Sequence, residues 1–238
     1  MANFGIKFDK FWQVFIEHNG YVKVVEGLQN TIIIAVLGLM IGVLIGTVIA
    51  AIKVSPGKGI LGRILNRVSG FYVALFRGTP IVVQLLVTYY VVLPLLEINI
   101  PPVNVCVLVF GFNSGAYVSE IMRGGILSVD PGQMEAGRAV GLSYGVTMTK
   151  VVVPQAVKNI LPTIGNEFIA LIKETSVVSF VGAVDLYVAF NYIGTNNYEF
   201  MVPYLVMALI YIVLVMLVSF LIKTMERSLR KSDRSSQS

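Results

Sequence analysis

Long apolar segments separated by short polar connections dominate the pattern of this chain of 238 residues. An α-helix needs about 20 consecutive apolar residues to cross the hydrocarbon core of a bilayer. Four uncharged segments have about that length, and a fifth, from Pro162 to Val184, is interrupted by Glu167, Lys173 and Glu174. We therefore predict an all-α polytopic membrane protein with five transmembrane helices, at about 27–52, 68–96, 101–123, 160–184 and 200–223.

The composition supports this prediction. Hydrophobic residues make up 56% of the chain and charged residues 13%, whereas an average soluble domain carries about 25% charged residues. The single Cys106 and the single His18 exclude a disulfide framework and disfavour a Cys/His metal site. The basic residues do not cluster on one folded domain, so we predict no nucleic acid partner. No cleaved signal peptide is expected, because residues 1–30 lack its pattern.

Basic residues fall in alternate connections, and this asymmetry predicts the orientation in the membrane. They are Lys53, Lys58, Arg63 and Arg67 in the first connection, Arg123, Arg138, Lys150 and Lys158 after the third span, and Lys223, Arg227, Arg230, Lys231 and Arg234 at the end. The intervening connections contain acidic residues and no lysine or arginine. We therefore expect the N-terminus outside and the C-terminus in the cytoplasm.

The segments on either side of the transmembrane domain, which we place at 21–228, have their own patterns. Five aromatic residues recur at helical spacing within residues 1–20: Phe4, Phe8, Phe11, Trp12 and Phe15. Lys7 and Lys10 lie elsewhere around that helix, which is typical of an amphipathic helix in the outer membrane interface. A loosely ordered tail is the alternative. Residues 229–238 are expected to form a frayed cytoplasmic tail.

A stripe of small residues marks the first predicted span. Gly38, Gly42 and Gly46 are spaced four apart, so they share one face of a helix. Such a stripe lets the backbone of a second helix approach closely within a membrane. We therefore predict a packing role for these glycines.

The connection after the third span is too long for a simple turn. Asp130 followed by Pro131 predicts a helix N-cap with proline in the first position. Glu135 then lies in the early turns, where its charge suits the helix dipole, and Gly141 can end the helix in a left-handed conformation. The pattern predicts a short helix parallel to the membrane that docks a soluble partner. A re-entrant or merely interfacial loop is the alternative.

The same connection carries a recognisable motif. The segment "EAGRAVGLSYGVTMTKVVVP", residues 135–154, resembles the EAA loop of ABC importer permeases. That pattern is Glu-Ala-Ala, three residues, glycine, nine residues, and an aliphatic-x-aliphatic-Pro ending. The residues in register are Glu135, Ala136, Gly141, Val151, Val153 and Pro154. Gly137 replaces the second alanine, which is a change from one small residue to another.

Further segments are similar to the polar amino acid uptake branch of that family. They are "RGTPIVVQLL", "NSGAYVSEIMRGGI", "PGQMEAGRAVG", "PQAVKNILPTIGNEFIALIKETS" and "VGAVDL". The resemblance implies the five-span architecture of type I importer permeases, with an N-terminal interfacial helix and a cytoplasmic coupling helix. It also implies a function: moving a polar or charged amino acid across the bacterial cytoplasmic membrane, driven by ATP hydrolysis in a separate subunit.

The resemblance further implies the partners. They are a dimer of ABC ATPase subunits docked on the EAA loop, a second permease subunit that is identical or a close paralogue, and an external solute-binding protein. Glu135, Ala136, Gly141 and Pro154 would couple ATP hydrolysis to transport. The chain itself has no GxxxxGK[ST] loop, since "SPGKGILG" lacks the spacing and the following hydroxyl residue. We therefore expect a transport subunit without an ATPase site, which binds no cofactor and leaves ATP and Mg to its partner.

Charged residues within a predicted span are functional-site candidates, because burying them in lipid is costly. If a span begins near Pro162, Lys173 lies about 16 Å along it, close to the middle of the bilayer. A lysine beside a glutamate suits the carboxylate and the ammonium of an amino acid. The resemblance also places substrate contacts along this Lys-Glu-Thr-Ser segment and at the following aspartate. The substrate-binding candidates are Lys173, Glu174, Thr175, Ser176, Asp185, Asn113 and Tyr117.

Alternatives to substrate binding remain open at this stage. Lys173 and Glu174 could form a structural ion pair between helices, and Glu120 could contribute to substrate binding from the facing helix. Arg77 fits an interfacial anchor or an ion-pair partner better than a substrate ligand. A stand-alone ion-coupled amino acid carrier is the main alternative function, although no inverted repeat is evident. An intramembrane enzyme is disfavoured by the absence of an HExxH motif, and a purely structural scaffold by the polar cluster. The sequence leaves the particular amino acid open.

Overall fold

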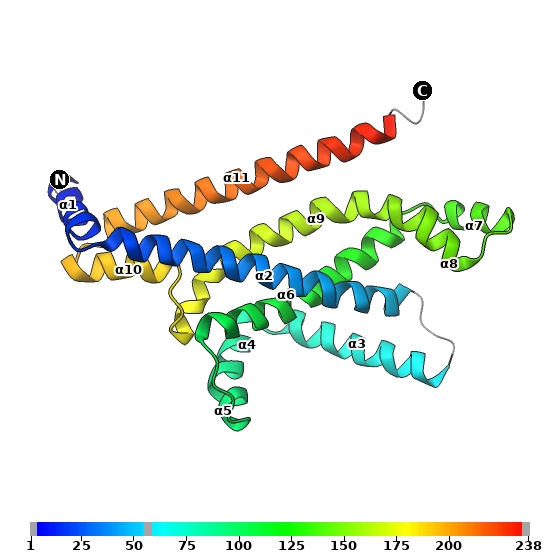
Figure 1. Cartoon of the computed structure of the whole chain (residues 1–238), viewed down its shortest axis with the longest axis horizontal. Coiled ribbons are helices and arrows are strands. Elements are labelled where there is room, and N and C mark those ends of the chain that lie inside the picture. The colour runs from blue at the N-terminus through cyan, green and yellow to red at the C-terminus, as the bar shows by residue number, and fades with distance from the viewer. Residues whose placement is uncertain (1–3, 55–58, 235–238) are drawn as a thin grey trace. The chain divides into compact units, whose positions relative to one another are not determined.

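The computed structural model describes residues 4–54 and 59–234, with side chains through Ser228. The order of elements is α1 (Phe4–Trp12), a π-helical turn (Gln13–Glu17), α2 (Gly20–Val54), α3 (Ile60–Gly78), α4 (Ile81–Val87), a π-helical turn (Thr88–Val92), α5 (Leu93–Leu95), α6 (Pro102–Leu127), α7 (Pro131–Ala139), α8 (Tyr144–Thr147), a π-helical turn (Met148–Val152), α9 (Val153–Glu174), a 3₁₀ segment (Thr175–Val181), α10 (Leu186–Asn197) and α11 (Met201–Arg234). Figure 1 shows them from α1, in blue, to α11, in red.

The prediction of an all-α fold is confirmed for the described residues, which contain no β-strand. In that part of the chain, α2, α6 and α11 are long and apolar enough to cross a membrane. The number of spans becomes five if each of two bent helix pairs, Ile60–Gly78 with Ile81–Leu95 and Tyr144–Val181 with Leu186–Asn197, counts as one span. Helices α2, α6 and α11 correspond to the expected spans 27–52, 101–123 and 200–223, with α6 and α11 each beginning one residue later than predicted.

The expected span 68–96 is not one continuous helix. Helix α3 ends at Gly78, and α4 begins at Ile81 after Pro80, whose backbone is extended at φ −63° and ψ 139°. Proline has no N–H to donate and disfavours a helical conformation at the residue before it, here Thr79. The Gln84 side chain then donates to the Thr79 carbonyl at 3.0 Å and to its hydroxyl at 2.9 Å. The break is therefore a stabilised feature of the fold.

The structure also differs from the prediction in the region of the expected span 160–184. The helix α9 begins at Val153, so Pro162 lies inside it, and its α-helical part ends at Glu174. The chain continues as the 3₁₀ segment to Val181 and turns at Gly182, whose φ of +77° is left-handed. Asp185 then caps α10. Glycine is favoured at such a turn because it has no Cβ to clash.

The expected cytoplasmic tail begins as a continuation of α11, and its cytoplasmic location stays a prediction. Helix α11 continues through Arg234, so residues 229–234 are helical rather than frayed. The remaining residues of the predicted tail, 235–238, lie outside the described part of the chain, as does Lys58 of the first basic connection.

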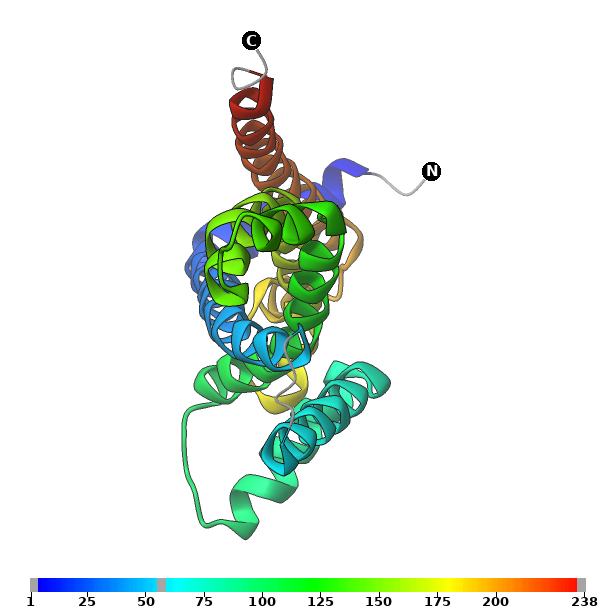
Figure 2. The ribbon, with the colours of Figure 1, turned by 90° about the vertical axis from the view of Figure 1, so that its right-hand side faces the viewer.

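The contacts divide the chain into two compact units, each described here by itself. Unit 1 comprises Met1–Gly38, Thr79–Gly111 and Ala170–Leu217, and unit 2 comprises Leu39–Gly78, Phe112–Ile169 and Val218–Ser238. Within unit 2, the short helices α7 and α8 connect the end of α6 to the turn that leads into α9 (Figures 1 and 2).

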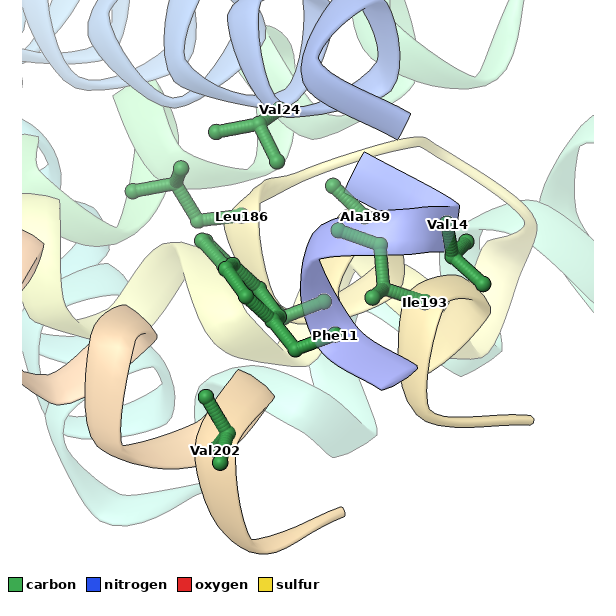
Figure 3. Packing of buried hydrophobic residues seen from close by; sticks show 8 residues of the cluster. Phe11, Val14, Val24, Leu186, Ala189, Ile193 and Val202 are labelled. Atoms are coloured by element: carbon green, nitrogen blue, oxygen red, sulfur yellow. The ribbon is translucent and has the colours of Figure 1, made fainter. Parts of the chain in front are cut away.

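The core of unit 1 is built around α10 (Figure 3). Leu186, Ala189, Phe190 and Ile193 of α10 pack with residues from the N-terminal segment, α2 and α11, namely Phe11, Val14, Val24 and Val202. Phe11 is 5% exposed and Val14 is fully buried. The predicted N-terminal helix is therefore present and packs onto α10, while Phe4, Phe8 and Trp12 remain exposed.

Polar contacts also fix the N-terminal helix. Lys7 forms an ion pair with Glu199 at 3.1 Å, and the Asn197 amide donates to the carbonyl oxygen of Lys10. Desolvation raises the pKa of Glu199, but hydrogen bonds from Lys7 and from the Met201 N–H outweigh it and keep the pKa below its usual range. The interfacial location of α1 stays a prediction.

The glycine stripe of α2 faces α6, and its predicted packing role is confirmed. A Cβ on Gly42 would lie 2.7 Å from the Ser114 side chain. One on Gly46 would lie 2.7 Å from Val118 and 2.9 Å from the backbone nitrogen of Ser119. Within unit 1, a Cβ added to Gly38 would likewise lie 3.1 Å from the Cβ of Phe110. The missing side chains therefore allow the backbones of α2 and α6 to approach.

We predict that Gly46→Ala lowers the thermal unfolding temperature of the detergent-purified protein. The new methyl group would collide with a backbone atom, which cannot move without shifting the helix, and such overpacking costs about 1–3 kcal/mol. Gly124→Ala on α6 is the matched control, because nothing lies within 4 Å of its added Cβ. Since alanine stabilises a helix interior over glycine by about 0.5–1 kcal/mol, this control should not destabilise. Equal unfolding temperatures for both variants would contradict the packing role.

Candidate functional site

The helix α7 is capped at its N-terminus as the sequence predicts. The side chain of Asp130 accepts a hydrogen bond from the Gly132 N–H at 2.8 Å, and Pro131 occupies the first turn. A capping side chain satisfies one of the free N–H groups of the first turn, and proline there loses nothing because it has no N–H to satisfy. The start of α7 is therefore fixed by local chemistry.

The end of α7 is also as predicted. Gly141 is left-handed, with φ +88°. Its N–H donates to the Arg138 carbonyl at 3.1 Å, and the Leu142 N–H donates to the Gly137 carbonyl at 3.1 Å. This pair of bonds is a Schellman motif, which satisfies the last carbonyls of a helix. Both ends of this short helix are therefore defined independently of any partner.

Helix α7 exposes the residues of the motif on its surface. Glu135 and Ala136 are exposed, and Val140, just after the helix, is 78% exposed. Gly137, in contrast, is buried against α8, where an added Cβ would lie 2.4 Å from the Cγ2 atom of Thr147. The replacement of alanine by Gly137 in the EAA motif therefore coincides with a tight contact.

Pro154 lies in the first turn of α9, directly after the π-helical turn Met148–Val152. Proline cannot donate the helical hydrogen bond that this position would otherwise make. The π-helix is rare and occurs mostly as single turns of this kind within α-helices. The motif thus ends where the chain enters the long helix α9.

The Lys-Glu-Thr-Ser segment lies where α9 changes into the 3₁₀ segment. The hydroxyl of Thr175 donates to the Ile172 carbonyl at 2.8 Å, and that of Ser176 donates to the Lys173 carbonyl at 3.2 Å. Thr175 is buried, whereas Lys173 and Glu174 are exposed in the chain on its own. The hydroxyls therefore stabilise the end of the helix, and the two charged side chains remain accessible.

Asp185 occupies a different environment from the other charged candidates. Its side chain is fully buried, and Oδ1 accepts a hydrogen bond from the Val188 N–H at 2.9 Å, which caps α10. Within the described residues, Oδ2 has no hydrogen-bond partner. The preceding Val184 carbonyl accepts from the Asn30 side chain at 2.9 Å. Asp185 therefore holds the break between the 3₁₀ segment and α10.

The sequence prediction missed the capping role of Asp185. The signal was available, since an aspartate after Gly182 and before the apolar "LYVAF" segment is a typical N-cap. The predicted span 160–184 ended directly before Asp185, and the sequence analysis named this residue only as a substrate-binding candidate.

Asn113 and Tyr117 belong to unit 2, whereas Lys173, Glu174, Thr175, Ser176 and Asp185 belong to unit 1. Asn113 is 4% exposed, and its side chain donates to the Phe76 carbonyl at 3.4 Å. Tyr117 lies one turn further along α6 and is 37% exposed, with the Arg77 guanidinium 5.4 Å from its ring centre. The candidates therefore form two local clusters, one in each unit.

A third cluster of polar residues joins α2 to α6. Lys53 forms an ion pair with Glu120 at 2.6 Å, and Arg123 forms another with the same carboxylate at 2.8 Å. The Lys53 and Glu120 side chains are 16% and 19% exposed. Glu120 is therefore engaged by two cations. The sequence analysis missed the pairing with Lys53, because the two residues are 67 positions apart.

These features define a polytopic membrane transport subunit: membrane-length helices, two interrupted helices with charged side chains nearby, and a short exposed helix in the motif register. The model of the family described as "Binding-protein-dependent transport system inner membrane component" matches residues 42–231. The chain belongs to this family, and it is a membrane component of such a transport system.

Individual relatives agree with this assignment. The arginine transport system permease protein ArtQ of Bacillus subtilis is 38% identical over 210 residues, which cover 88% of this chain and 94% of the relative. The glutamine transport system permease protein GlnP of Escherichia coli is 35% identical over 208 residues, which cover 87% and 92%.

Solved structures are similar as well. The crystal structure of an amino acid ABC transporter with histidines superimposes with a TM-score of 0.81 at 40% identity, over 90% of this chain and 98% of that one. The MetNI methionine ABC transporter in an inward-facing form has a TM-score of 0.69 at 21% identity, over 87% and 95%. The second likeness shows the fold alone.

We predict that Gly137→Ala destabilises the contact between α7 and α8, and that Thr147→Ser restores it. The added methyl group would collide with the Thr147 methyl group, which serine lacks. Serine keeps the hydroxyl that donates to the Ser143 carbonyl at 3.0 Å. Overpacking of this kind costs about 1–3 kcal/mol, so the unfolding temperature should fall in the single variant and recover in the double variant. Additive effects of the two substitutions would contradict this contact.

Proposed function

We propose that this chain is the permease subunit of an ATP-binding cassette importer and moves a polar or charged amino acid across the cytoplasmic membrane of a bacterium. The observation that carries the proposal is helix α7: a motif in the EAA register, capped at both ends, with Glu135 and Ala136 exposed. The similar proteins named as arginine and glutamine permeases support an amino acid as the substrate.

The proposed assembly contains subunits beyond this chain. Two ABC ATPase subunits, which bind ATP and Mg, dock on the EAA loops of two permease copies or of two close paralogues. An external solute-binding protein delivers the amino acid. This chain binds no cofactor and performs no hydrolysis of its own, in agreement with the lack of a GxxxxGK[ST] loop in its sequence.

The orientation follows from the basic connections. With basic residues on the cytoplasmic side, α7 faces the cytoplasm, the N-terminus lies outside and α11 ends in the cytoplasm. The short helix then lies where a cytoplasmic ATPase can reach it. From Pro154, α9 leads through the membrane toward Lys173 and Glu174, so movement of α7 can be transmitted along one helix.

The proposed substrate site includes the Lys-Glu-Thr-Ser segment beside the break at Gly182–Asp185. Transporters commonly bind substrates where transmembrane helices are interrupted, because free backbone groups and polar side chains are available there. Lys173 and Glu174 supply the accessible charges, Thr175 and Ser176 end the helix beneath them, and Asp185 holds the break. Asn113 and Tyr117 of α6 stay candidates for contact with the amino acid.

We expect Gly141→Pro to abolish ATP-driven amino acid uptake while the protein still inserts into the membrane. Proline cannot adopt the observed φ of +88°, and it cannot donate the bond from position 141 to Arg138. Gly141→Asn is the matched control, because asparagine tolerates the left-handed conformation and keeps the N–H. Uptake by reconstituted vesicles containing the ATPase and the binding protein measures the effect.

Glu135→Lys should abolish uptake in the same vesicles, since it reverses the charge of an exposed residue on the docking helix. Loss of the co-purified ATPase together with loss of uptake is the expected result. Normal ATP-driven uptake by both the Gly141→Pro and the Glu135→Lys variants would refute the coupling role of α7. Robust uptake by the lone chain in vesicles without ATP would instead indicate an ion-coupled carrier.

Lys173→Met and Glu174→Gln should each weaken amino acid uptake by about tenfold or more, the effect of losing one charge-assisted hydrogen bond. The measurement is the concentration dependence of uptake by the intact complex. Both substitutions nearly preserve side-chain volume, so assembly should survive, and gel filtration of the complex checks this. Normal affinity and uptake in both variants would remove these residues from the substrate site, and failure of assembly would favour a structural ion pair.

A further inference from the structure

Helix α3, drawn in cyan in Figure 1, packs within unit 2 through one of its faces. Val73 lies in a buried cluster with Ile49 of α2 and Ala116 of α6. The opposite face carries four apolar side chains at a spacing of three or four residues, which form an apolar stripe along the helix. They are Ile64, Val68, Phe71 and Leu75, with exposed fractions of 53%, 61%, 69% and 47%. In the chain on its own, the apolar stripe therefore faces outward.

A surface hollow with two arginines lies at the beginning of the apolar stripe, and its volume is about 590 Å³. Arg63 and Arg67 line it one helical turn apart, which places their Cβ atoms about 5–6 Å from each other. Both side chains are exposed. The hollow is also lined by Ile60, Ile64, Asn66 and Val68. It therefore combines a polar edge with an apolar edge that continues into the apolar stripe.

The helix that carries these two positive charges does not balance them. Residues 60–78 contain no aspartate or glutamate. Among the side chains that the structure describes, Arg63 and Arg67 take part in no ion pair. The planar fork of a guanidinium group matches the oxygens of a phosphate, and the bonds between them are charge-assisted. The hollow is therefore suited to a phosphate group.

The length of the apolar stripe matches one leaflet of a bilayer. From Arg67 to Leu75 the helix rises about 12 Å, and from Arg63 to Leu75 about 18 Å. Half of the hydrocarbon core of a bilayer is about 15 Å thick. A ligand with its phosphate in the hollow can therefore lay an apolar chain of one leaflet's length along the stripe.

We propose that α3 binds an anionic phospholipid of the cytoplasmic leaflet, with the lipid phosphate between Arg63 and Arg67 and an acyl chain along the apolar stripe. The choice of leaflet rests on the orientation proposed above, in which the first basic connection is cytoplasmic. Anionic lipids give the cytoplasmic leaflet its negative surface potential, and basic pockets at that level bind their head groups. The lipid takes the place of a protein partner for the first half of α3.

A second copy of the chain is the competing occupant of this exposed face. It would bury the two guanidinium groups, and burying a charge without a partner is strongly unfavourable. The same face of a second copy offers no acid, since residues 60–78 lack one. A zwitterionic lipid offers a phosphate, but the arginines repel its ammonium group. Charge complementarity therefore favours an anionic lipid.

The test places a fluorescent reporter in the apolar stripe. Trp12 is the single tryptophan of the chain, so Phe71→Trp in a Trp12→Phe background leaves one tryptophan, and it lies in the stripe. The purified full-length chain in detergent micelles is titrated with brominated phosphatidylglycerol or brominated phosphatidylcholine, whose bromine atoms quench tryptophan on contact. The reporter should prefer phosphatidylglycerol by roughly 10-fold to 30-fold, and Arg63→Gln with Arg67→Gln should remove most of that preference.

Control variants define the cause. Lys223→Gln with Arg227→Gln removes two exposed positive charges that are also one turn apart, but on α11, and should leave the preference unchanged. Arg63→Gln and Arg67→Gln as single substitutions should each lower the preference about fivefold, and they serve if the double variant aggregates in gel filtration. Inorganic phosphate should not displace the lipid, because it has no acyl chain to lie along the stripe.

Four results would overturn the proposal. The first is equal quenching by both lipids, or a preference that survives the loss of both arginines. The second is an equal loss in the α11 control, since net charge rather than the hollow would then select the lipid. The third is quenching by neither lipid, which would show that protein covers the stripe and favour a second copy. The fourth is displacement by inorganic phosphate, which would reduce the hollow to a simple anion site.

This titration and the transport experiments fail independently. The titration contains no ATPase, binding protein or amino acid, so a negative result leaves the proposed transport function standing. Conversely, a chain that supports no ATP-driven uptake can still show the preference for phosphatidylglycerol at its α3 reporter.

Discussion

A helix that is interrupted within a membrane must satisfy the backbone groups that the interruption releases, because lipid offers no hydrogen bonds. Both interruptions of this chain meet that constraint with side chains. Gln84 bonds to Thr79 at the first break, and Asp185 and Thr175 bond to backbone groups on the two sides of the second. The candidates Lys173, Glu174, Thr175 and Ser176 lie where α9 changes into the 3₁₀ segment before the second break, and Asp185 caps the helix after it.

The chain connects α7 to the end of α9 through short local elements. A capped helix with a glycine end behaves as a rigid element, and α7 is joined to α9 through α8 and one π-helical turn. From Val153, α9 is helical as far as Glu174, where the 3₁₀ segment begins. The tight contact between Gly137 and Thr147 makes α7 and α8 move together.

Local chemistry was predictable from the sequence, and distant contacts were not. Asp130 and Gly141 define the ends of α7 through bonds to near neighbours in the chain, so their residue types were sufficient. The long apolar segments likewise predicted α2, α6 and α11. Pro80 and Gly182 were visible, but an apolar segment of membrane length led to the expectation of a continuous span. The capping bond of Asp185 is local and was missed because this residue was considered only as a substrate-binding candidate.

The polar site on α6 required the structure. Lys53 meets Glu120 across 67 positions, and Arg77 meets Tyr117 across a helix packing contact, so neither pairing has a signature in a single sequence. The glycine stripe of α2 could be predicted, but not the helix that it contacts.

Helix α6 combines two roles on neighbouring faces. Ser114 and Val118 receive the glycines of α2, while Asn113 and Tyr117, one position earlier in each case, turn about 100° away toward the end of α3. Close packing on one face holds α6 against α2 and so fixes the direction of the other face. A polar face in a membrane is tolerable only if its groups find partners. Glu120 has two cations, Asn113 has a carbonyl, and Arg77 has an aromatic ring that orients its charge without cancelling it.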